Sequence, residues 1–318
     1  MHVVITGGAG FIGSQTAEAL LNRGDSVSVI DVFDYGYDPK RKEHNIALLS
    51  QYEKFKLYRG DIRNRALLDQ MFQDDKPDVV VHLAARAGVR PSLLEPDSYA
   101  DINITGTIHI LEAMRAVNCD RMVFASSSSV YGSRKQGPFR ETDNVDVPAS
   151  PYAATKRAGE IICANYHYLY KMHCTCLRFF TVYGPRQRPE MAIHLFAEKI
   201  KNGESITMFG DGSSIRDYTF VDDIVKGVIA AIDRPLGYEI INLGNCSPIR
   251  LDALIEAIST AVGKEAIIHR LPDQPGDVPL TFAEVSKAKQ LLEYAPDTPI
   301  SVGLRQFITW LNQYEMEN

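Results

Sequence analysis

A glycine-rich turn near the N-terminus limits what this 318-residue chain can fold into. The apolar run Val3–Thr6 leads into the turn, and Phe11–Arg23 behind it has helical spacing. The glycines of the turn recur at intervals of three residues: Gly7, Gly10 and Gly13. The first permits a tight turn, the second lets the backbone approach a pyrophosphate, and the third lets helix and strand pack closely. The N–H groups at the helix start, around Phe11 and Ile12, would face the phosphates, so the pattern predicts a dinucleotide site.

Short apolar runs alternate with helical patterns through the first 180 residues. The segment Pro77–Leu83 holds three consecutive valines, Val79–Val81, as expected for a parallel strand buried on both faces. Further strands are expected at Ser26–Asp31, Phe55–Arg59, Arg121–Ala125 and Cys174–Arg178, and helices at Arg65–Phe72, Tyr99–Ala116 and Ser150–Tyr170. We predict an α/β fold: a Rossmann-type doubly wound parallel sheet over 1–180, followed by a smaller α/β substrate-binding domain over 181–318. Residues 219–244 are expected to return to the first sheet.

Two acidic residues follow predicted strands and fit an adenosine site. Asp31 ends the second strand, where a carboxylate accepts hydrogen bonds from ribose hydroxyls and repels a 2′-phosphate, which favours NAD over NADP. Asp61, next to Ile62, follows the third strand and could accept from the adenine amino group. For Asp61 a plainer explanation is equally good, because a carboxylate there could cap the helix Arg65–Phe72.

Tyr152 and Lys156 lie four residues apart in a predicted helix, so both side chains can face one ligand. A phenol with a pKa near 10 is a poor base at neutral pH. A neighbouring ammonium and a positive nicotinamide ring would lower that pKa, and the pair could then take a proton from a sugar hydroxyl. The spacing alone also occurs on exposed helix faces; Pro151 and the upstream glycine turn favour the catalytic interpretation.

Four serines follow the strand Arg121–Ala125 directly: Ser126, Ser127, Ser128 and Ser129. Hydroxyls at the carboxyl end of a strand can hydrogen-bond the reacting group, although serine runs also form ordinary turns. Spacing does not decide which serine acts.

Together with Gly276-Asp277, these motifs resemble the extended short-chain dehydrogenase/reductase family, and within it the nucleotide-sugar epimerases. The resemblance covers essentially the whole chain and implies a catalytic triad of Ser127, Tyr152 and Lys156. It also implies NAD contacts by Tyr152 and Lys156 and by Ser126, Leu83, Ala84, Ala85, Asn103 and Phe180, and a substrate contact by Ser127.

The serine run indicates the reaction within this family. Sugar 4,6-dehydratases carry an Asp-Glu pair after the catalytic residue, and UDP-glucuronate decarboxylases carry a Glu at the position of Ser129. Here Ser128 and Ser129 supply no ionisable group, which favours 4-epimerisation, an isomerase reaction in which NAD stays bound.

Two longer stretches, 85–92 and 179–192, resemble UDP-glucuronate 4-epimerases, which implies conversion of UDP-glucuronate to UDP-galacturonate. Thr181 and the serines could hold the sugar carboxylate through neutral hydrogen bonds, and Arg216 and Arg188 would meet the diphosphate. Arg90 and Asp277 are further candidate substrate contacts. Many UDP-glucose epimerases have an Arg where this chain has Gln274, so the roles of Gln274 and Asp277 stay open.

Composition sets the remaining expectations. A net charge of −6 argues against a nucleic-acid binder, and no apolar run approaches the length of a membrane span. The five cysteines lack a zinc-binding pattern, so no metal is expected and the thiols are interpreted as reduced. We expect a cytoplasmic homodimer, formed in this family by a four-helix bundle of helices such as Tyr99–Ala116 and Ser150–Tyr170. A UDP-glucose or UDP-N-acetylhexosamine 4-epimerase, a decarboxylase and a non-catalytic NAD-sensing module remain the alternatives.

Overall fold

The computed structural model describes residues 1–33, 38–272 and 278–317, and is built around a seven-stranded sheet. In spatial order its strands are β11 (Tyr238–Leu243), β6 (His173–Phe179), β5 (Arg121–Ser127), β4 (Val79–His82), β1 (His2–Thr6), β2 (Ser26–Asp31) and β3 (Phe55–Arg59). Every neighbouring pair is parallel. Successive strands build outward from β1 in both directions, so a ligand crevice is expected beyond its carboxyl end.

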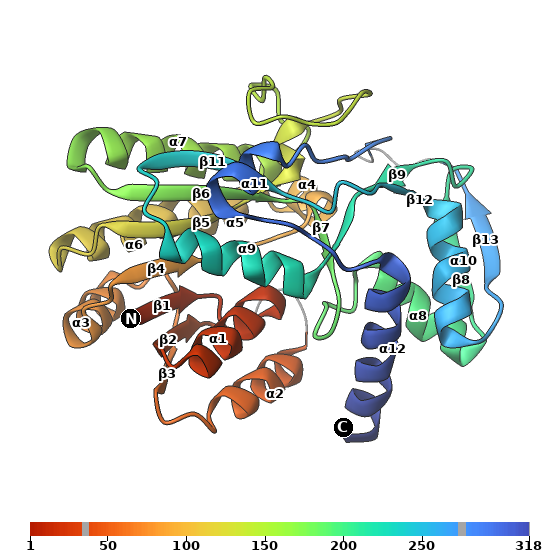
Figure 1. Cartoon of the computed structure of the whole chain (residues 1–318), viewed down its shortest axis with the longest axis horizontal. Helices are drawn as coiled ribbons and strands as arrows, with labels where there is room; N and C mark the ends of the chain where they lie inside the picture. The colour runs from red at the N-terminus through yellow and green to blue at the C-terminus, as the bar shows by residue number, and fades with distance from the viewer. Residues whose placement is uncertain (34–37, 273–277, 318) are drawn as a thin grey trace.

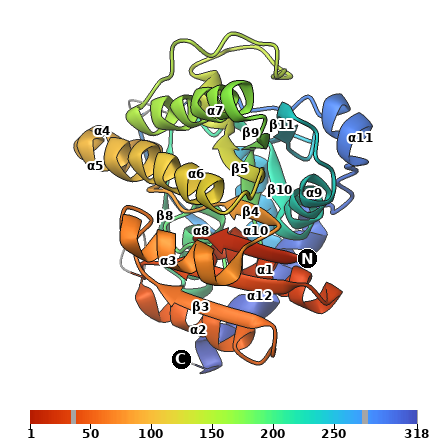
Figure 2. The same cartoon turned by 90° about the vertical axis from the view of Figure 1, so that its left-hand side faces the viewer.

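Helices cover both faces of this sheet (Figure 1, Figure 2). On one face lie α3 (Arg65–Asp75), α6 (Gly106–Ala116) and α7 (Pro151–Tyr170), and on the other lie α1 (Phe11–Arg23) and α9 (Val221–Asp233). Strand residues alternate between the two cores: Val3 and Ile5 pack on the α1 side, and Val4 packs on the α3 side. The α/β doubly wound class predicted from the sequence is confirmed.

The remaining elements gather beyond the carboxyl ends of the strands, at the right of Figure 1. They include the helices α8 (Ala192–Asn202), α10 (Leu251–Val262) and α12 (Ile300–Glu317), whereas α11 (Ser286–Leu292) packs beside β11 and α9. Short strand pairs complete the region: β8 (Ser205–Phe209) with β13 (Ile267–Leu271), β7 (Thr181–Tyr183) with β10 (Tyr218–Phe220), and β9 (Ile215–Arg216) with β12 (Ile249–Arg250).

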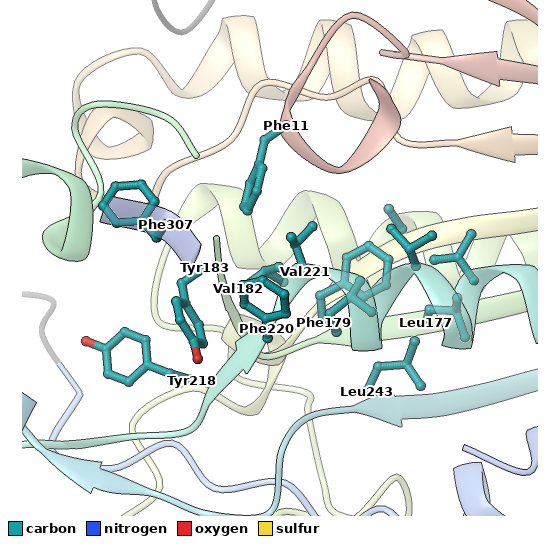
Figure 3. Close-up of a cluster of buried hydrophobic side chains, with 14 of the residues drawn as sticks. Phe11, Leu177, Phe179, Val182, Tyr183, Tyr218, Phe220, Val221, Leu243 and Phe307 are labelled. Carbon is teal, nitrogen blue, oxygen red and sulfur yellow. The ribbon is translucent and has the colours of Figure 1, made fainter. Parts of the chain in front are cut away.

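One apolar core joins this region to the sheet (Figure 3). Leu177 and Phe179 of β6 belong to the same buried cluster as Tyr183 and Phe220 of the small strand pair and Phe307 of α12. Burying a large apolar side chain contributes about 1.5–3 kcal/mol. The shared cluster therefore holds the small region firmly over the strand ends.

The segment Tyr99–Ala116 differs from the single helix that its spacing predicted. The structure has α5 (Pro96–Ala100), then a π-helical turn over Asp101–Thr105, then α6. Such turns are frequent at functional sites. This one contains Asn103, whose amide binds the backbone of Arg86 at both N and O.

Among the described residues, the helices α2 (Pro39–Leu49), α4 (Val89–Leu94) and α11 were not predicted. α2 begins where the Asp38 side chain accepts from the Lys40 N–H, and α4 follows Gly88. A Pro behind an Asp is a recognised helix start, so the sequence did carry a signal for α2.

Candidate active site

A cavity of about 820 Å³ lies at the carboxyl ends of the sheet strands. This volume falls in the range of small-molecule and cofactor sites. Most of the residues selected from the sequence line it: Gly7, Gly10, Phe11, Ile12, Gly13, Asp31, Asp61, Ile62, Leu83, Ala84, Ala85, Ser126, Ser127, Ser128, Ser129, Tyr152, Lys156, Phe180, Thr181, Arg188 and Arg216.

The glycine turn leaves no room for side chains. Gly7 has φ +71°, and a Cβ there would lie 2.8 Å from the backbone N of Ala84. A Cβ on Gly13 would lie 2.4 Å from the carbonyl O of Gly7. Gly10 caps α1 without a side-chain hydrogen bond, and the first turn of the helix holds no acidic residue. Its N–H groups and positive dipole end are thus available to a pyrophosphate, as the glycine spacing predicted.

Asp31 is nearly buried beside this turn. Its carboxylate accepts from the backbone N–H groups of Ala9 (3.2 Å) and Phe33 (3.0 Å), and from Lys42 Nζ (2.9 Å). Lys42 also lines the cavity and was missed in the sequence, because it comes from the unpredicted helix α2. The two side chains form a charged rim where an adenosine ribose would sit.

Asp61 lines the cavity as well, but does not cap α3. Asn64 performs that role by accepting from the Leu67 N–H, so the capping explanation for Asp61 is wrong. Arg63 instead holds the Asp61 carboxylate through its Nε, and these hydrogen bonds lower the pKa of Asp61.

Tyr152, Lys156 and Ser127 come together at the inner end of the cavity. Burial raises the pKa of the Tyr152 phenol, while a hydrogen bond with Ser127 and the charge of Arg188 oppose that rise. For the chain by itself the phenol pKa is therefore raised. The lowering predicted from the sequence depends on the charge of a bound nicotinamide and stays a prediction.

Lys156 is 4% exposed, and its Nζ donates to the carbonyl O of Ala125 at 2.7 Å. Burial lowers the pKa of this amine to about 8, and the Cys163 thiol and then the Glu160 carboxylate oppose that lowering. The amine is charged at neutral pH and sits close to its titration range, which suits a group that stabilises a nearby phenolate.

The serine loop is ordered by its own hydroxyls. Ser127 Oγ accepts from the backbone N (3.2 Å) and the Oγ (2.9 Å) of Ser129, which leaves the Ser127 proton to be donated. Ser126, by contrast, donates its hydroxyl to Glu160 Oε1 at 2.6 Å. Among these serines, the geometry thus singles out Ser127 as the partner of Tyr152.

Two sequence-selected residues do not reach the cavity wall. Arg90 lies between the lining residues Val89 and Pro91, but its guanidinium stacks 5.2 Å from the ring centroid of Phe209. Because successive residues of a helix point in different directions, α4 turns Arg90 away while its neighbours line the site. Asn103 lies behind the wall, 2% exposed, where it supports the backbone of Arg86. Asp277 and Gln274 lie outside the described residues.

The cavity also has lining residues that the sequence did not single out. Arg86 carries an ion pair with Glu95 at 2.7 Å, and the ring of Tyr99 packs edge-on against that of Tyr152 at 6.2 Å. Arg188, which the sequence did single out, forms an ion pair with Glu190 at 3.2 Å and lowers the pKa of both Tyr99 and Tyr152 against burial. Nothing in the local spacing of Arg86 or Tyr99 indicated their positions.

Comparison with known proteins defines the class. A family model described as the NAD dependent epimerase/dehydratase family matches residues 3–244, and the chain belongs to this family. The UDP-glucuronate 4-epimerase of Thermodesulfobacterium geofontis is 43% identical, with 97% of this chain and 95% of that protein covered. UDP-glucuronate 4-epimerase 4 of Arabidopsis thaliana is 41% identical, with 98% and 75% covered.

Solved structures agree with this assignment. UDP-glucuronic acid 4-epimerase from Bacillus cereus, in complex with UDP-glucuronic acid and NAD, matches with a TM-score of 0.92 at 38% identity, covering 99% of this chain and 100% of that one. UDP-glucose 4-epimerase from Thermotoga maritima, with UDP-glucose, also matches with a TM-score of 0.92, at 29% identity and the same coverage. The family and fold predicted from the sequence are confirmed.

Neither a membrane-spanning helix nor a metal-binding cluster occurs among the described residues. No helix among them combines the length and apolar character needed to cross a bilayer. In the same part of the chain, no three His, Cys, Asp or Glu side chains gather as a metal site requires.

Proposed function

We propose that the protein is an NAD-dependent UDP-sugar 4-epimerase that converts UDP-glucuronate to UDP-galacturonate. One observation carries the proposal: a single cavity contains Tyr152, Lys156 and Ser127 together with a serine loop that offers hydroxyls and no acid at positions 128 and 129. The relatives named UDP-glucuronate 4-epimerase, which align along nearly all of this chain, support the substrate.

The residues of the cavity fit NAD. The glycine turn and the start of α1 would hold the pyrophosphate, and Asp31 the adenosine ribose. Phe180, 3% exposed, would flank the nicotinamide. When bound, NAD supplies the acceptor for the C4 hydride and the source from which it returns.

The chain's own task is to move a proton on and off the sugar O4. The Lys156 ammonium stabilises the Tyr152 phenolate, which takes the proton from O4 and becomes the neutral phenol; the phenol gives the proton back when the sugar is reduced. Ser127, whose lone pairs are occupied by Ser129, donates its hydrogen bond toward the same oxygen. Since the hydride must return to the other face of the 4-keto sugar, the sugar has to rotate within the cavity before it is reduced.

Neutral donors suit a carboxylate that must turn with its ring. Ser128 and Thr181 would hold the sugar carboxylate by hydrogen bonds, and Ser129 would join them once its hydroxyl turns away from Ser127. Hydrogen bonds that hold the carboxylate in each orientation of the ring keep it out of the alignment in which a β-keto acid loses CO₂. Arg188 and Arg216, both on the cavity wall, would bind the diphosphate. Arg90 is replaced in this proposal by Arg86, which lines the cavity.

The test is incubation of the purified protein with UDP-glucuronate without added NAD, followed by separation of the UDP-sugars. UDP-galacturonate should accumulate to an equilibrium mixture. Conversion of UDP-glucose or UDP-N-acetylglucosamine in its place would overturn the substrate assignment, and release of CO₂ with a UDP-pentose would identify a decarboxylase.

Assembly and location complete the proposal. We propose a cytoplasmic homodimer, in which α6 and α7 of two subunits form a four-helix bundle. The outer face of α7 carries Ile161, Tyr168 and Leu169, which are 54%, 74% and 52% exposed. Exposed apolar groups in one stripe are typical of an interface. Free thiols at all five cysteines are compatible with a reducing compartment.

The two regions of the chain divide the work in this proposal. Residues 1–180 supply the NAD site and the catalytic groups, and residues 181–318 supply the diphosphate contacts. Within the second region, β11 extends the sheet of the first by pairing with β6.

A further inference from the structure

One face of α7 contacts the end of β5 at three successive levels. Tyr152, Lys156 and Glu160 are spaced four residues apart, so they lie on one side of the helix. Each meets a different residue of the strand end: Tyr152 shares a hydrogen bond with Ser127, Lys156 Nζ donates to the carbonyl O of Ala125 (2.7 Å), and Glu160 Oε1 accepts from Ser126 Oγ (2.6 Å). The first two contacts belong to the catalytic groups; the third has no part in the chemistry proposed above.

Four hydrogen-bond donors fix the carboxylate of Glu160. Arg178 of β6 binds it with two parallel hydrogen bonds, Nε to Oε1 at 2.8 Å and Nη2 to Oε2 at 2.9 Å. Arg157 adds a third donor at 3.1 Å, and Ser126 is the fourth. All four lone-pair positions of the carboxylate are thus used, and the side chains of Glu160 and Arg178 are 0% and 1% exposed.

Stability alone does not account for this arrangement. Two charges taken out of water lose their hydration, and a buried ion pair is often no more stabilising than apolar side chains of the same volume. What a bidentate pair provides is a fixed geometry. Arg178 lies opposite Ser126 in the register of β5 and β6, so the pair sits directly behind the serine loop.

We propose that Glu160, clamped by Arg178, is a positioning residue that fixes the end of β5 against α7. By anchoring Ser126, it sets the direction in which Ser127 meets the Tyr152 phenol. This role rests on the proposed function, because it concerns the same catalytic groups, and it adds to them a pair that touches neither substrate nor cofactor.

Glu160 also affects the charge of Lys156, one helical turn away. Its carboxylate raises the pKa of the amine against the larger lowering by burial, which together place it at about 8. The other titratable groups that face Lys156 are the Cys163 thiol on α7 and the His82 imidazole on β4. Burial lowers the pKa of His82 to about 3, so this ring is neutral at working pH. Two groups raise the pKa of Lys156 against burial: the Cys163 thiol has the larger effect and the Glu160 carboxylate the smaller, and Glu160 is the acidic side chain of the two.

The first test is Glu160→Gln, which keeps the shape and removes the charge. We expect kcat on UDP-glucuronate to fall roughly ten- to a hundred-fold, as for a misplacement of about 1 Å, with KM changed less than about twofold. The alkaline limb of the pH profile should move to lower pH, because Lys156 loses a neighbouring negative charge. The control is Glu239→Gln, which removes the charge of an acid on β11 that pairs with Lys287 of α11. It should change neither kcat nor the alkaline limb.

Two further variants guard against a simple folding defect. Glu160→Gln combined with Arg178→Gln removes both charges, and so leaves no unpaired ion in the core. Ser126→Ala removes only the anchored hydroxyl; if Glu160 acts through Ser126, the effects of Ser126→Ala and Glu160→Gln on kcat will be less than additive.

A measurement without substrate separates this proposal from the proposed function. The titration of Tyr152 is followed by nuclear magnetic resonance of ring-labelled tyrosine, with the signal assigned by Tyr152→Phe. In Glu160→Gln we expect the pKa of Tyr152 to rise, since its hydrogen bond with Ser127 is disturbed. The proposal is overturned if the folded variant Glu160→Gln with Arg178→Gln has the kcat, the alkaline limb of the pH profile and the Tyr152 pKa of the wild type. Failure of the wild type to epimerise any UDP-sugar overturns the proposed function, while the titration still decides the role of Glu160.

Discussion

Raising the pH through the titration of Lys156 should switch off catalysis without unfolding the protein. Burial lowers the pKa of this amine from its usual 10.5 to about 8. Since the charged amine is the form that stabilises the Tyr152 phenolate, the rate should fall about tenfold per pH unit above that value. The nicotinamide charge of bound NAD lowers the pKa of Lys156 and a Tyr152 phenolate raises it, so the alkaline limb is expected near pH 8.

The same shift affects stability in the opposite direction. Below pH 8 the amine is charged in both states, and the folded state bears the full cost of burying the charge. Between pH 8 and 10.5 the unfolded chain binds the proton and the folded chain does not, so the free energy of unfolding rises with pH. At about 1.4 kcal/mol per unit, the shift corresponds to about 3 kcal/mol.

The assay compares wild type with Lys156→Met at a series of pH values. Initial rates of UDP-glucuronate epimerisation locate the alkaline limb, and urea unfolding gives the free energies. Over this interval the wild type should gain up to about 3 kcal/mol relative to Lys156→Met, while its own activity disappears. An activity that stays constant to pH 10, or a loss of activity that coincides with unfolding, would refute the reasoning.

The remaining predictions concern the phenol, the glycine turn and the subunit interface. Tyr152→Phe should lower kcat about 10²- to 10⁴-fold with unchanged urea unfolding, and near wild-type turnover would rule out the phenol as the acid–base group. Gly13→Ala places a Cβ 2.4 Å from the carbonyl O of Gly7, which cannot move aside easily. We expect a loss of about 1–3 kcal/mol in unfolding free energy and at least tenfold less NAD retained on purification; full retention contradicts the assigned turn. Ile161→Glu should convert the dimer to monomers in analytical ultracentrifugation, whereas Leu195→Glu, an exposed apolar position on α8, should not. A wild type that sediments as a monomer excludes the proposed bundle.

Features set by local spacing were predictable from the sequence. The intervals of the glycine turn specify a strand, a tight turn and a helix, and the structure forms them with Gly7 at φ +71°. Tyr152 and Lys156 share a helix face because their separation matches the helical repeat. The valine run within Pro77–Leu83 predicted a buried parallel strand, and β4 (Val79–His82) is such a strand.

Contacts between distant segments needed the tertiary structure. Lys42 reaches Asp31 only because α2 packs beside the glycine turn, and nothing in the sequence near Lys42 indicates that contact. Arg86 and Arg90 lie in the same short stretch of sequence, 85–92. The path of the chain into α4 nevertheless puts Arg86 on the cavity wall and Arg90 over the ring of Phe209.

The sequence by itself determined the fold class and the family, and it predicted the glycine turn and the pair Tyr152 and Lys156, because these motifs depend on residues a few positions apart. Only the tertiary structure decided how these groups are supported. Glu160 and Arg178 come from different elements, and their ion pair forms only when α7 packs on the sheet beside β6. A buried charge is stable only with its partner in place. The role of Glu160 or of Arg178 can therefore be inferred only once the structure shows the two side chains in contact.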